Sequence, residues 1–172
     1  MILFVLNVAE RFLPLDSTSA TFELCLAHIC LCHVGGHQCG PCMLAGIFLP
    51  TGRERDALTR TLAAKSCLPV FLDAKTIDLY YNGFCNSVLW SLFHYVPLQT
   101  DSRLSETRTL QFQWDAYQEA NRRFAEVLLK QHRPGDVVWV QDYHLMMLPA
   151  LLKAKAPDMK VRRLCPEPCT FF

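Results

Sequence analysis

The stretch of sequence that decides the fold runs from Asp136 to Pro149 and reads Asp-Val-Val-Trp-Val-Gln-Asp-Tyr-His-Leu-Met-Met-Leu-Pro. A turn signal precedes it at residues 132–136, because proline fixes φ there and glycine accepts a positive φ. Residues 137–140 are β-branched or aromatic and apolar on both faces, which is typical of a strand buried inside a parallel sheet. From Leu145 onward the apolar residues take the spacing of a helix. The pattern predicts a β-strand followed directly by an α-helix.

Two side chains that can bind a ligand stand between this strand and this helix. They are Asp142 and His144. In open α/β sheets, ligands bind in the crevice outside the carboxyl ends of the strands, so both side chains are candidate substrate contacts. The alternative is structural: Asp142 caps the following helix and His144 packs against it. These residues alone leave both interpretations open.

Composition indicates one globular domain. The chain has 172 residues, of which 51% are hydrophobic and 19% charged. Its 17 basic and 16 acidic side chains form no basic stripe, so we expect no nucleic-acid partner. No apolar run approaches the length of about 18 residues that a membrane span needs, so we expect no membrane partner. The apolar start at residues 1–6 lacks the basic residues of a secretory signal, which predicts a cytoplasmic protein with reduced cysteines.

Residues 1–45 are unlike the rest of the chain because they concentrate cysteine and histidine. The residues concerned are Cys25, His28, Cys30, Cys32, His33, His37, Cys39 and Cys42. A Cys-x-x-Cys pair at 39–42 supplies ligands that could hold zinc, but the second pair lacks the spacing of a zinc finger. A zinc-stapled segment and incidental, poorly ordered sequence both remain open. Signals for regular structure are weak throughout these residues.

From residue 46 onward, the spacing of apolar residues alternates between helix and strand. The expected elements are a helix from Thr51 to about Lys65, a strand at 67–72, two short helices separated at Gly83, a long helix at 101–131, the strand at 137–140 with its helix to about Ala156, and a last strand that starts at Met159 and breaks down at Arg162. This order predicts a doubly wound, mostly parallel α/β fold. Neither a glycine-rich dinucleotide fingerprint nor a P-loop is present.

The window from residue 80 to residue 95 is dense in aromatic and amide side chains. It contains Tyr80, Tyr81, Asn82, Phe84, Asn86, Trp90, His94 and Tyr95. Such side chains bind sugars well, because ring faces stack on C–H groups while amides and hydroxyls pair with sugar hydroxyls. An aromatic stripe at helical spacing also serves as hydrophobic core, and from the residues alone the core interpretation is favoured.

Three motifs together resemble the trehalose-6-phosphate synthase family. They are Val-Phe-Leu-Asp at 70–73, Tyr-Tyr-Asn-Gly-Phe-Cys-Asn-Ser-Val-Leu-Trp at 80–90 and Val-Trp-Val-Gln-Asp-Tyr-His-Leu-Met at 138–146. The resemblance covers about residues 46–161. It implies an α/β fold, namely an incomplete Rossmann-like N-terminal domain of a two-domain glycosyltransferase of the GT-B type. In this interpretation residues 1–45 are a divergent segment and residues 162–172 a divergent tail.

The resemblance also implies a reaction: transfer of glucose from UDP-glucose to glucose 6-phosphate with retention, without a metal or other cofactor. By motif, Tyr81 and Trp90 would lie at the acceptor sugar phosphate, and Asp142 would accept hydrogen bonds from its hydroxyls. A carboxylate is a strong acceptor and tyrosine offers both a ring face and a phenol, which fits those roles. His144 would play a supporting role, in packing or behind the ligand contacts.

Several features of the family have no counterpart here. Arg11 is only a loose equivalent of the family's phosphate-binding arginine, the tryptophan expected before Gly46 is absent, and the histidine motif expected after Val161 is missing. The donor-binding domain is also missing. We therefore expect a fragment with no assigned catalytic residue, inactive alone and able to use UDP-glucose only if a second domain is supplied. The alternative is a non-catalytic regulatory module that senses sugar phosphate or binds synthase subunits.

Overall fold

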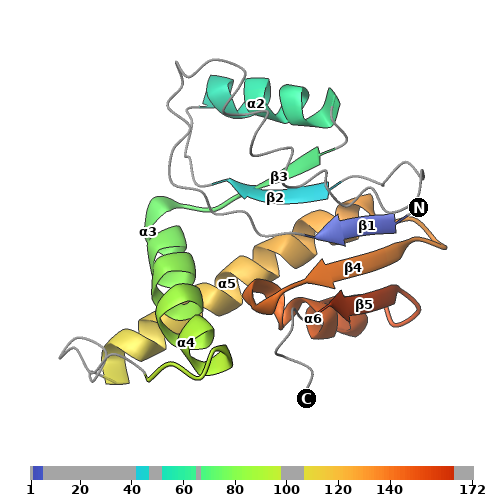
Figure 1. Ribbon diagram of the computed structural model, residues 1–172. Helices are drawn as coiled ribbons and strands as arrows, with labels where there is room; N and C mark the ends of the chain where they lie inside the picture. Colours follow the sequence, from blue (N-terminus) through green and yellow to red (C-terminus); the bar gives the residue numbers. More distant parts are fainter. Residues whose placement is uncertain (1, 6–41, 47–51, 65–66, 98–106, 165–172) are drawn as a thin grey trace.

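The computed structural model describes residues 2–5, 42–46, 52–64, 67–97 and 107–164, which form a five-stranded parallel sheet (Figure 1). The strands are β1 (Ile2–Val5), β2 (Cys42–Gly46), β3 (Cys67–Phe71), β4 (Val137–Gln141) and β5 (Lys160–Leu164). Their spatial order is β3-β2-β1-β4-β5, with every pairing parallel. Parallel pairing requires crossover connections, which the intervening helices supply.

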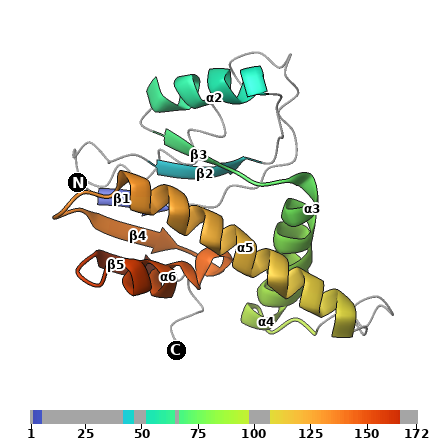
Figure 2. The same ribbon diagram turned by 180° about the vertical axis from the view of Figure 1, so that it is seen from behind.

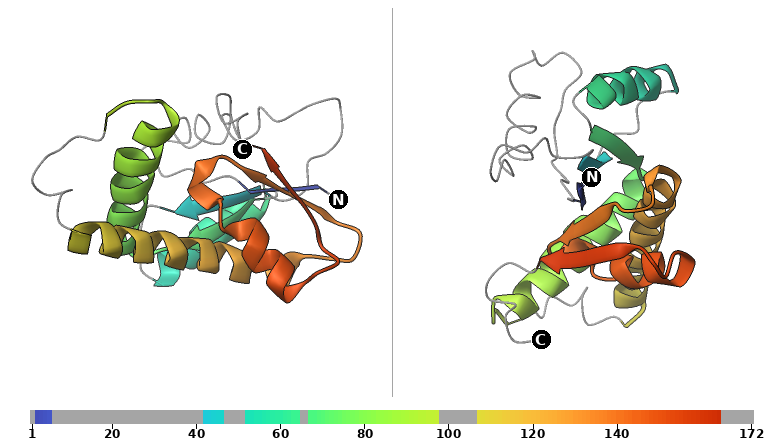
Figure 3. Two further views of the ribbon diagram at one scale, coloured as in Figure 1. Left: turned by 90° about the horizontal axis from the view of Figure 1, so that it is seen from below. Right: turned by 90° about the vertical axis from the view of Figure 1, so that its right-hand side faces the viewer.

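Helices cover the sheet and also stand across the end at which its strands finish. They are α2 (Gly52–Ala64), α3 (Ala74–Ile77), the π-helix η1 (Asp78–Leu89), α4 (Trp90–Phe93), α5 (Thr107–Gln131), the 3₁₀ turn η2 (Tyr143–Leu145) and α6 (Leu148–Lys155). Helices α5 and α6 lie on one face of the sheet, as the view from behind shows (Figure 2). The continuous run α3–η1–α4 stands beyond the tips of the strand arrows (Figure 3). No helix in the described part of the chain has the length and apolarity needed to cross a membrane.

The strand predicted at 137–140 is confirmed as β4, which lies between β1 and β5. Val138 and Val140 are fully buried on the face that the helices cover, whereas Val137 and Trp139 are half-buried. Pro69 is tolerated in β3 because, among the described strands, β3 lies at the edge of the sheet and pairs with β2 alone. The parallel α/β arrangement predicted from the sequence is therefore correct.

The core lies between β4 and the long helix α5. Apolar residues recur at three- and four-residue steps in the sequence of this helix and predict one apolar stripe, which includes Leu110, Tyr117, Phe124 and Leu128. The last three of these are almost completely buried. Burying one such side chain stabilises the fold by about 1.5–3 kcal/mol relative to leaving it exposed. Leu110, at the start of the same stripe, is exposed, because α5 extends past the sheet at that end.

The prediction that Gly83 separates two helices is wrong. The chain is helical without a break from Ala74 to Phe93, and its central part is wound as the wider π-helix η1. A Cβ atom at Gly83 would lie 2.8 Å from Nε2 of Gln113 on α5. The glycine therefore permits close approach of two helices, a tertiary role that looks like a helix break in the local sequence.

Two further predictions about the ends of the chain need correction. Residues 2–5 and 42–46 form strands although the first 45 residues give weak signals for regular structure, and β1 is the central strand of the sheet. The last strand does not break down at Arg162 but continues to Leu164. It can carry two arginines because β5 is the edge strand of the sheet as far as the structure describes it, and both side chains are exposed. The rest of the Cys/His-rich segment and of the tail lies outside the described residues.

Candidate functional site

The loop that leaves β4 at its carboxyl end has a strained backbone at Asp142, with φ 71° and ψ 174°. This region of φ/ψ space is essentially confined to glycine, and other residues in it cost about 1–3 kcal/mol. Oδ1 of Asp142 accepts a hydrogen bond from the backbone N–H of Tyr143 at 2.6 Å, so the carboxylate caps η2. Asp142 therefore caps the turn η2 and not the helix that the sequence predicts from Leu145, because α6 begins only at Leu148, with Met147 at its N-cap and no side-chain cap. Capping alone does not require a strained backbone.

Buried polar side chains from η1 and α5 hold this loop in place. The hydroxyl of Tyr117 donates to the carbonyl of Tyr143 at 2.9 Å and accepts from the N–H of Met146 at 2.9 Å. The carbonyl of His144 accepts from the Tyr80 hydroxyl at 3.1 Å and from Nδ2 of Asn121 at 3.4 Å. These contacts over-determine the loop, which is the condition under which backbone strain persists.

The two hydroxyls that brace the loop remain protonated donors. Burial raises the pKa of Tyr80 and of Tyr117 well above the usual value. Sequence reasoning assigned Tyr117 to an apolar stripe and did not single out Asn121. The available signal was polar groups within an apolar helix face, since a buried hydroxyl or amide requires a hydrogen-bond partner.

The electrostatics of the loop favour a charged Asp142. Burial alone would raise the pKa of its carboxyl, but the hydrogen bonds from the His144 side chain and the Tyr143 amide outweigh that effect. His94 acts in the same direction, and the resulting pKa lies below the ordinary value. The side chain of Asp142 keeps 31% of its surface exposed, so a charged hydrogen-bond acceptor faces solvent at the carboxyl end of β4.

Tyr81 and Asp142 come together on the imidazole of His144. The ring of Tyr81 stacks on that of His144, with centroids 5.4 Å apart and planes 18° apart, and Oδ2 of Asp142 lies 3.4 Å from its Nδ1. Tyr143 stacks on the ring as well, at 4.2 Å. Two of the three site residues predicted from the sequence thus contact one common group, although they come from η1 and from the loop after β4.

Trp90 is linked to this group less directly. Its side chain is 42% exposed and stacks on His94, with centroids 4.4 Å apart. Nδ1 of His94 lies 2.7 Å from the carbonyl of Trp90, and His94 is close enough to Asp142 to lower its pKa. The exposed indole can stack on a sugar, and it belongs to the same helical run as Tyr81.

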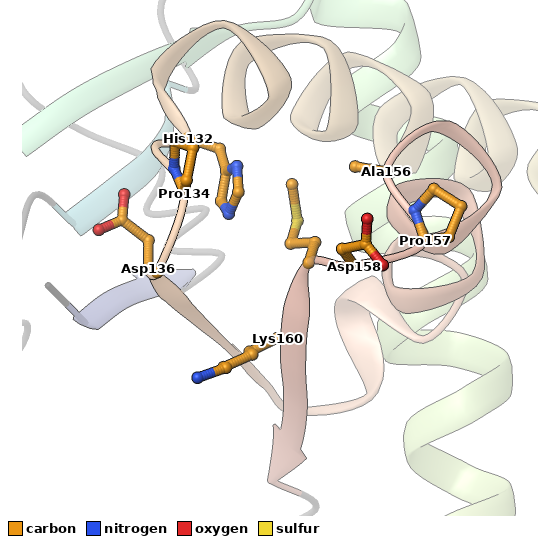
Figure 4. Close-up of a pocket in the computed structure, with 9 residues that line it drawn as sticks. His132, Pro134, Asp136, Ala156, Pro157, Asp158 and Lys160 are labelled. Atoms are coloured by element: carbon orange, nitrogen blue, oxygen red, sulfur yellow. The ribbon is translucent and has the colours of Figure 1, made fainter.

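A hollow of about 280 Å³ lies at the opposite end of the strands, where β4 and β5 begin (Figure 4). Its lining includes His132, Asp136, Asp158 and Lys160. The carboxylate of Asp136 accepts the N–H of Arg133 at 2.9 Å and so closes the turn before β4. Parallel α/β sheets bind ligands at the carboxyl ends of their strands, and this hollow lies at the amino ends.

No group of three or more metal-ligating side chains occurs among the residues that the structure describes. The zinc hypothesis concerns the cluster from Cys25 to Cys42, and its members from Cys25 to Cys39 lie outside those residues. Only Cys42 of that cluster falls in a described element, as the first residue of β2.

Comparison with solved structures defines the class of fold. The N-terminal domain of a trehalose-6-phosphate phosphatase from Candida albicans matches 94% of this chain with a TM-score of 0.63 and 20% sequence identity, and the match covers 32% of that chain. A trehalose-phosphate synthase from Burkholderia xenovorans, solved in complex with glucose-6-phosphate, matches 95% of this chain and 32% of its own with a TM-score of 0.53 and 20% identity. The chain folds as part of a Rossmann-like α/β domain of the GT-B type.

Sequence comparison then identifies the family. Residues 49–163 match the family model of Glycosyltransferase family 20, and the chain belongs to this family. An alpha,alpha-trehalose-phosphate synthase [UDP-forming] of Arabidopsis thaliana is 49% identical over 117 residues, which are 68% of this chain and 12% of that protein. The corresponding synthase of Yarrowia lipolytica is 51% identical over 93 residues, 54% of this chain and 18% of its own. The chain therefore spans 12–18% of the length of these two relatives.

Proposed function

We propose that this chain forms the acceptor-binding side of a trehalose-6-phosphate synthase and binds glucose 6-phosphate at the carboxyl end of β4. The family reaction is transfer of glucose from UDP-glucose to glucose 6-phosphate. Its relatives carry the name UDP-forming trehalose-phosphate synthase, and one structural neighbour was solved with glucose-6-phosphate. In this proposal Asp142 accepts hydrogen bonds from sugar hydroxyls, and Tyr81 and Trp90 line the same site.

The strained, braced and ionised Asp142 is the observation that carries the proposal. Backbone strain of this kind clusters at ligand sites, because the ligand contact requires a side-chain direction that relaxed backbone does not give. Here two tyrosines and an asparagine on neighbouring helices maintain the strain. An ionised carboxylate is also a stronger acceptor for hydroxyl groups than a neutral oxygen.

We further propose that the 172-residue chain binds the acceptor without catalysing transfer. Retaining transfer from a nucleotide sugar depends on positive groups that stabilise the charge developing on the departing diphosphate. None of the residues proposed to bind the acceptor is a lysine or arginine. Mixing the chain with UDP-glucose and glucose 6-phosphate should release no UDP above background, and steady release would contradict this part of the proposal.

Calorimetric titration with glucose 6-phosphate tests the binding itself. Asp142→Asn keeps the oxygen that caps Tyr143 and tolerates a positive φ, so its effect reports the lost charge. We expect about tenfold weaker binding, since hydrogen bonds to charged groups contribute about 1.5–3 kcal/mol. Asp115→Asn is the matched control, because that carboxylate is exposed on α5 and bonds only Gln111 among the contacts described. Equal affinity of the two variants would contradict the proposal.

A second candidate is a non-catalytic module that pairs with synthase subunits. Large apolar side chains exposed around the end of α4, at Leu92, Tyr95 and Val96, favour this alternative. Sedimentation of the chain mixed with a full-length synthase of this family distinguishes the two candidates. Co-sedimentation that Leu92→Ser abolishes would support subunit pairing, and separate sedimentation would remove it.

A further inference from the structure

The side chain of His144 is a buried polar group at the centre of the candidate site. Its ring lies between the rings of Tyr81 and Tyr143, and its backbone carbonyl is held by Tyr80 and Asn121. Only 8% of the residue is exposed. A ring stacked on two others and tied through its backbone has little freedom to turn, so the position of each ring nitrogen is set by the fold.

The two ring nitrogens have different surroundings. Nδ1 lies 3.4 Å from Oδ2 of Asp142, whereas Nε2 is buried and has no hydrogen-bond partner among the described residues. An ionised carboxylate only accepts hydrogen bonds, so the proton of the neutral ring belongs on Nδ1. For the neutral ring, the surroundings therefore select the tautomer with its proton on Nδ1.

We propose that His144 is a positioning residue for the acceptor site, which orients Asp142 through an Nδ1–H contact and fixes Tyr81 through its ring face. The inference rests on the proposed function, because it names the group that aligns two proposed ligand contacts. The Tyr143 amide holds one carboxylate oxygen of Asp142 and the imidazole holds the other. The carboxylate keeps 31% of its surface exposed, so a sugar hydroxyl can reach its remaining lone pairs.

The contact of 3.4 Å is long for a hydrogen bond, and such contacts often tighten when the ligand binds. Other ionisable groups surround the pair. They are Tyr80, Tyr81 and Cys85 of η1, His94 after α4, Tyr117 of α5 and Tyr143 of the loop. Burial raises the pKa of Cys85 and of the buried tyrosines, so these groups are neutral near pH 7 and leave Asp142 as the charged partner of the ring.

Two NMR measurements on the whole 172-residue chain test the inference. Nitrogen-15 NMR of the histidine rings distinguishes the two neutral tautomers, and His144 should carry its proton on Nδ1. The majority tautomer of free histidine, with the proton on Nε2, would overturn the proposal. In His144→Phe, carbon-13 NMR should show the Asp142 carboxyl titrating at higher pH than in the wild type, and an unchanged titration would also overturn it. Neither readout requires a ligand.

Two variants separate positioning from packing. His144→Phe keeps an aromatic ring for stacking and removes both nitrogens, so the melting temperature should be unchanged or higher, because an unpaired buried nitrogen is lost. Affinity for glucose 6-phosphate should nevertheless fall about tenfold, the equivalent of one hydrogen bond. His144→Asn places an amide near the position of Nδ1 and should keep most of the affinity despite a lower melting temperature.

The outcomes of these variants are distinct. A phenylalanine variant that binds as tightly as wild type overturns the positioning role, as does an asparagine variant that folds but binds no better than phenylalanine. If His144→Asn does not fold, the tautomer and the Asp142 titration decide. If the wild type itself does not bind glucose 6-phosphate, the proposed function fails, while the NMR readouts still judge whether His144 orients Asp142.

Discussion

The two ends of β4 each carry an aspartate beside a turn, and the two turns are built differently. At the entrance, Gly135 takes the positive φ of 92°, and the buried Asp136 accepts the N–H of Arg133. At the exit, Asp142 itself takes the positive φ, and its carboxylate keeps part of its surface exposed. Glycine accepts this conformation at no steric cost, whereas aspartate is strained in it.

The comparison teaches how a structural acid differs from a candidate binding acid of the same type. Asp136 is buried and closes the turn before β4 through its contact with the N–H of Arg133. Asp142 makes a similar capping contact, but the chain retains strain there, and two helices supply hydrogen bonds that hold the loop. The predictions below contrast the two ends and are ordered from the largest expected effect to the smallest.

Removal of the Tyr117 hydroxyl, which holds the loop after β4, should lower the stability of the fold more than any substitution within the two turns. Tyr117→Phe leaves the Tyr143 carbonyl and the Met146 amide without their partner, so the free energy of unfolding should fall by about 2–4 kcal/mol. Urea denaturation measures the change. Tyr95→Phe is the control, because Tyr95 is 81% exposed, and similar losses in the two variants would contradict a special role of the brace.

Replacement of the strained residue should separate stability from binding. In Asp142→Gly the relief of backbone strain offsets the lost cap, so the free energy of unfolding should stay within about 1 kcal/mol of wild type. Affinity for glucose 6-phosphate should fall at least about tenfold, since the acceptor carboxylate is gone. A variant that is clearly unstable, or one that still binds normally, would show that the exit acid is structural like Asp136.

The reverse pattern is expected at the entrance. Gly135→Ala meets no atom within 4 Å, so its only cost is the positive φ, about 1–2 kcal/mol. Affinity for glucose 6-phosphate should not change, because this turn lies at the opposite end of β4. Gly135→Asn should recover part of the stability, since asparagine tolerates this conformation. Weaker binding in a folded Gly135→Ala variant would contradict our placement of the binding site at the carboxyl end of β4.

The smallest effect concerns the dependence of stability on pH. The pKa of Asp142 is lower in the folded chain than its ordinary value, so the folded state binds fewer protons. Its contribution is therefore present above the unfolded pKa and is lost as pH falls through the folded pKa. Asp142→Asn should lose less stability than wild type between neutral and acidic pH, as measured by thermal unfolding. Parallel curves for the two proteins would contradict the lowered pKa.

Much of the fold could be predicted because strands and helices have local signatures. The apolar run at 137–140 and the stripe on α5 predicted β4 and the longest helix correctly. Gly83 and Arg162 were misjudged because their explanations are not local. The first lies against Gln113 of another helix, and the second lies on a sheet edge that only the full strand order reveals.

The candidate site was predictable only in part, because its local motifs can be identified in the sequence but its tertiary contacts cannot. Motif resemblance selected Tyr81, Trp90 and Asp142, and position after a strand selected Asp142 and His144. The meeting of Tyr81 and Asp142 on the His144 ring depends on how η1 stands across the end of the sheet, which no spacing in the sequence reveals. The strain at Asp142 depends on backbone angles, and its residue type gave no sign of them.

Our central claim is that glucose 6-phosphate binds at the carboxyl end of β4. Amide chemical shifts recorded during a titration with glucose 6-phosphate test it most directly, because they report on both ends of β4 at once. Our account predicts that the largest shifts occur at Tyr81, Trp90 and residues 141–144, with no change at residues 132–136. Shifts confined to residues 132–136 and 156–160, around the opposite hollow, would contradict it, and so would a spectrum that glucose 6-phosphate leaves unchanged.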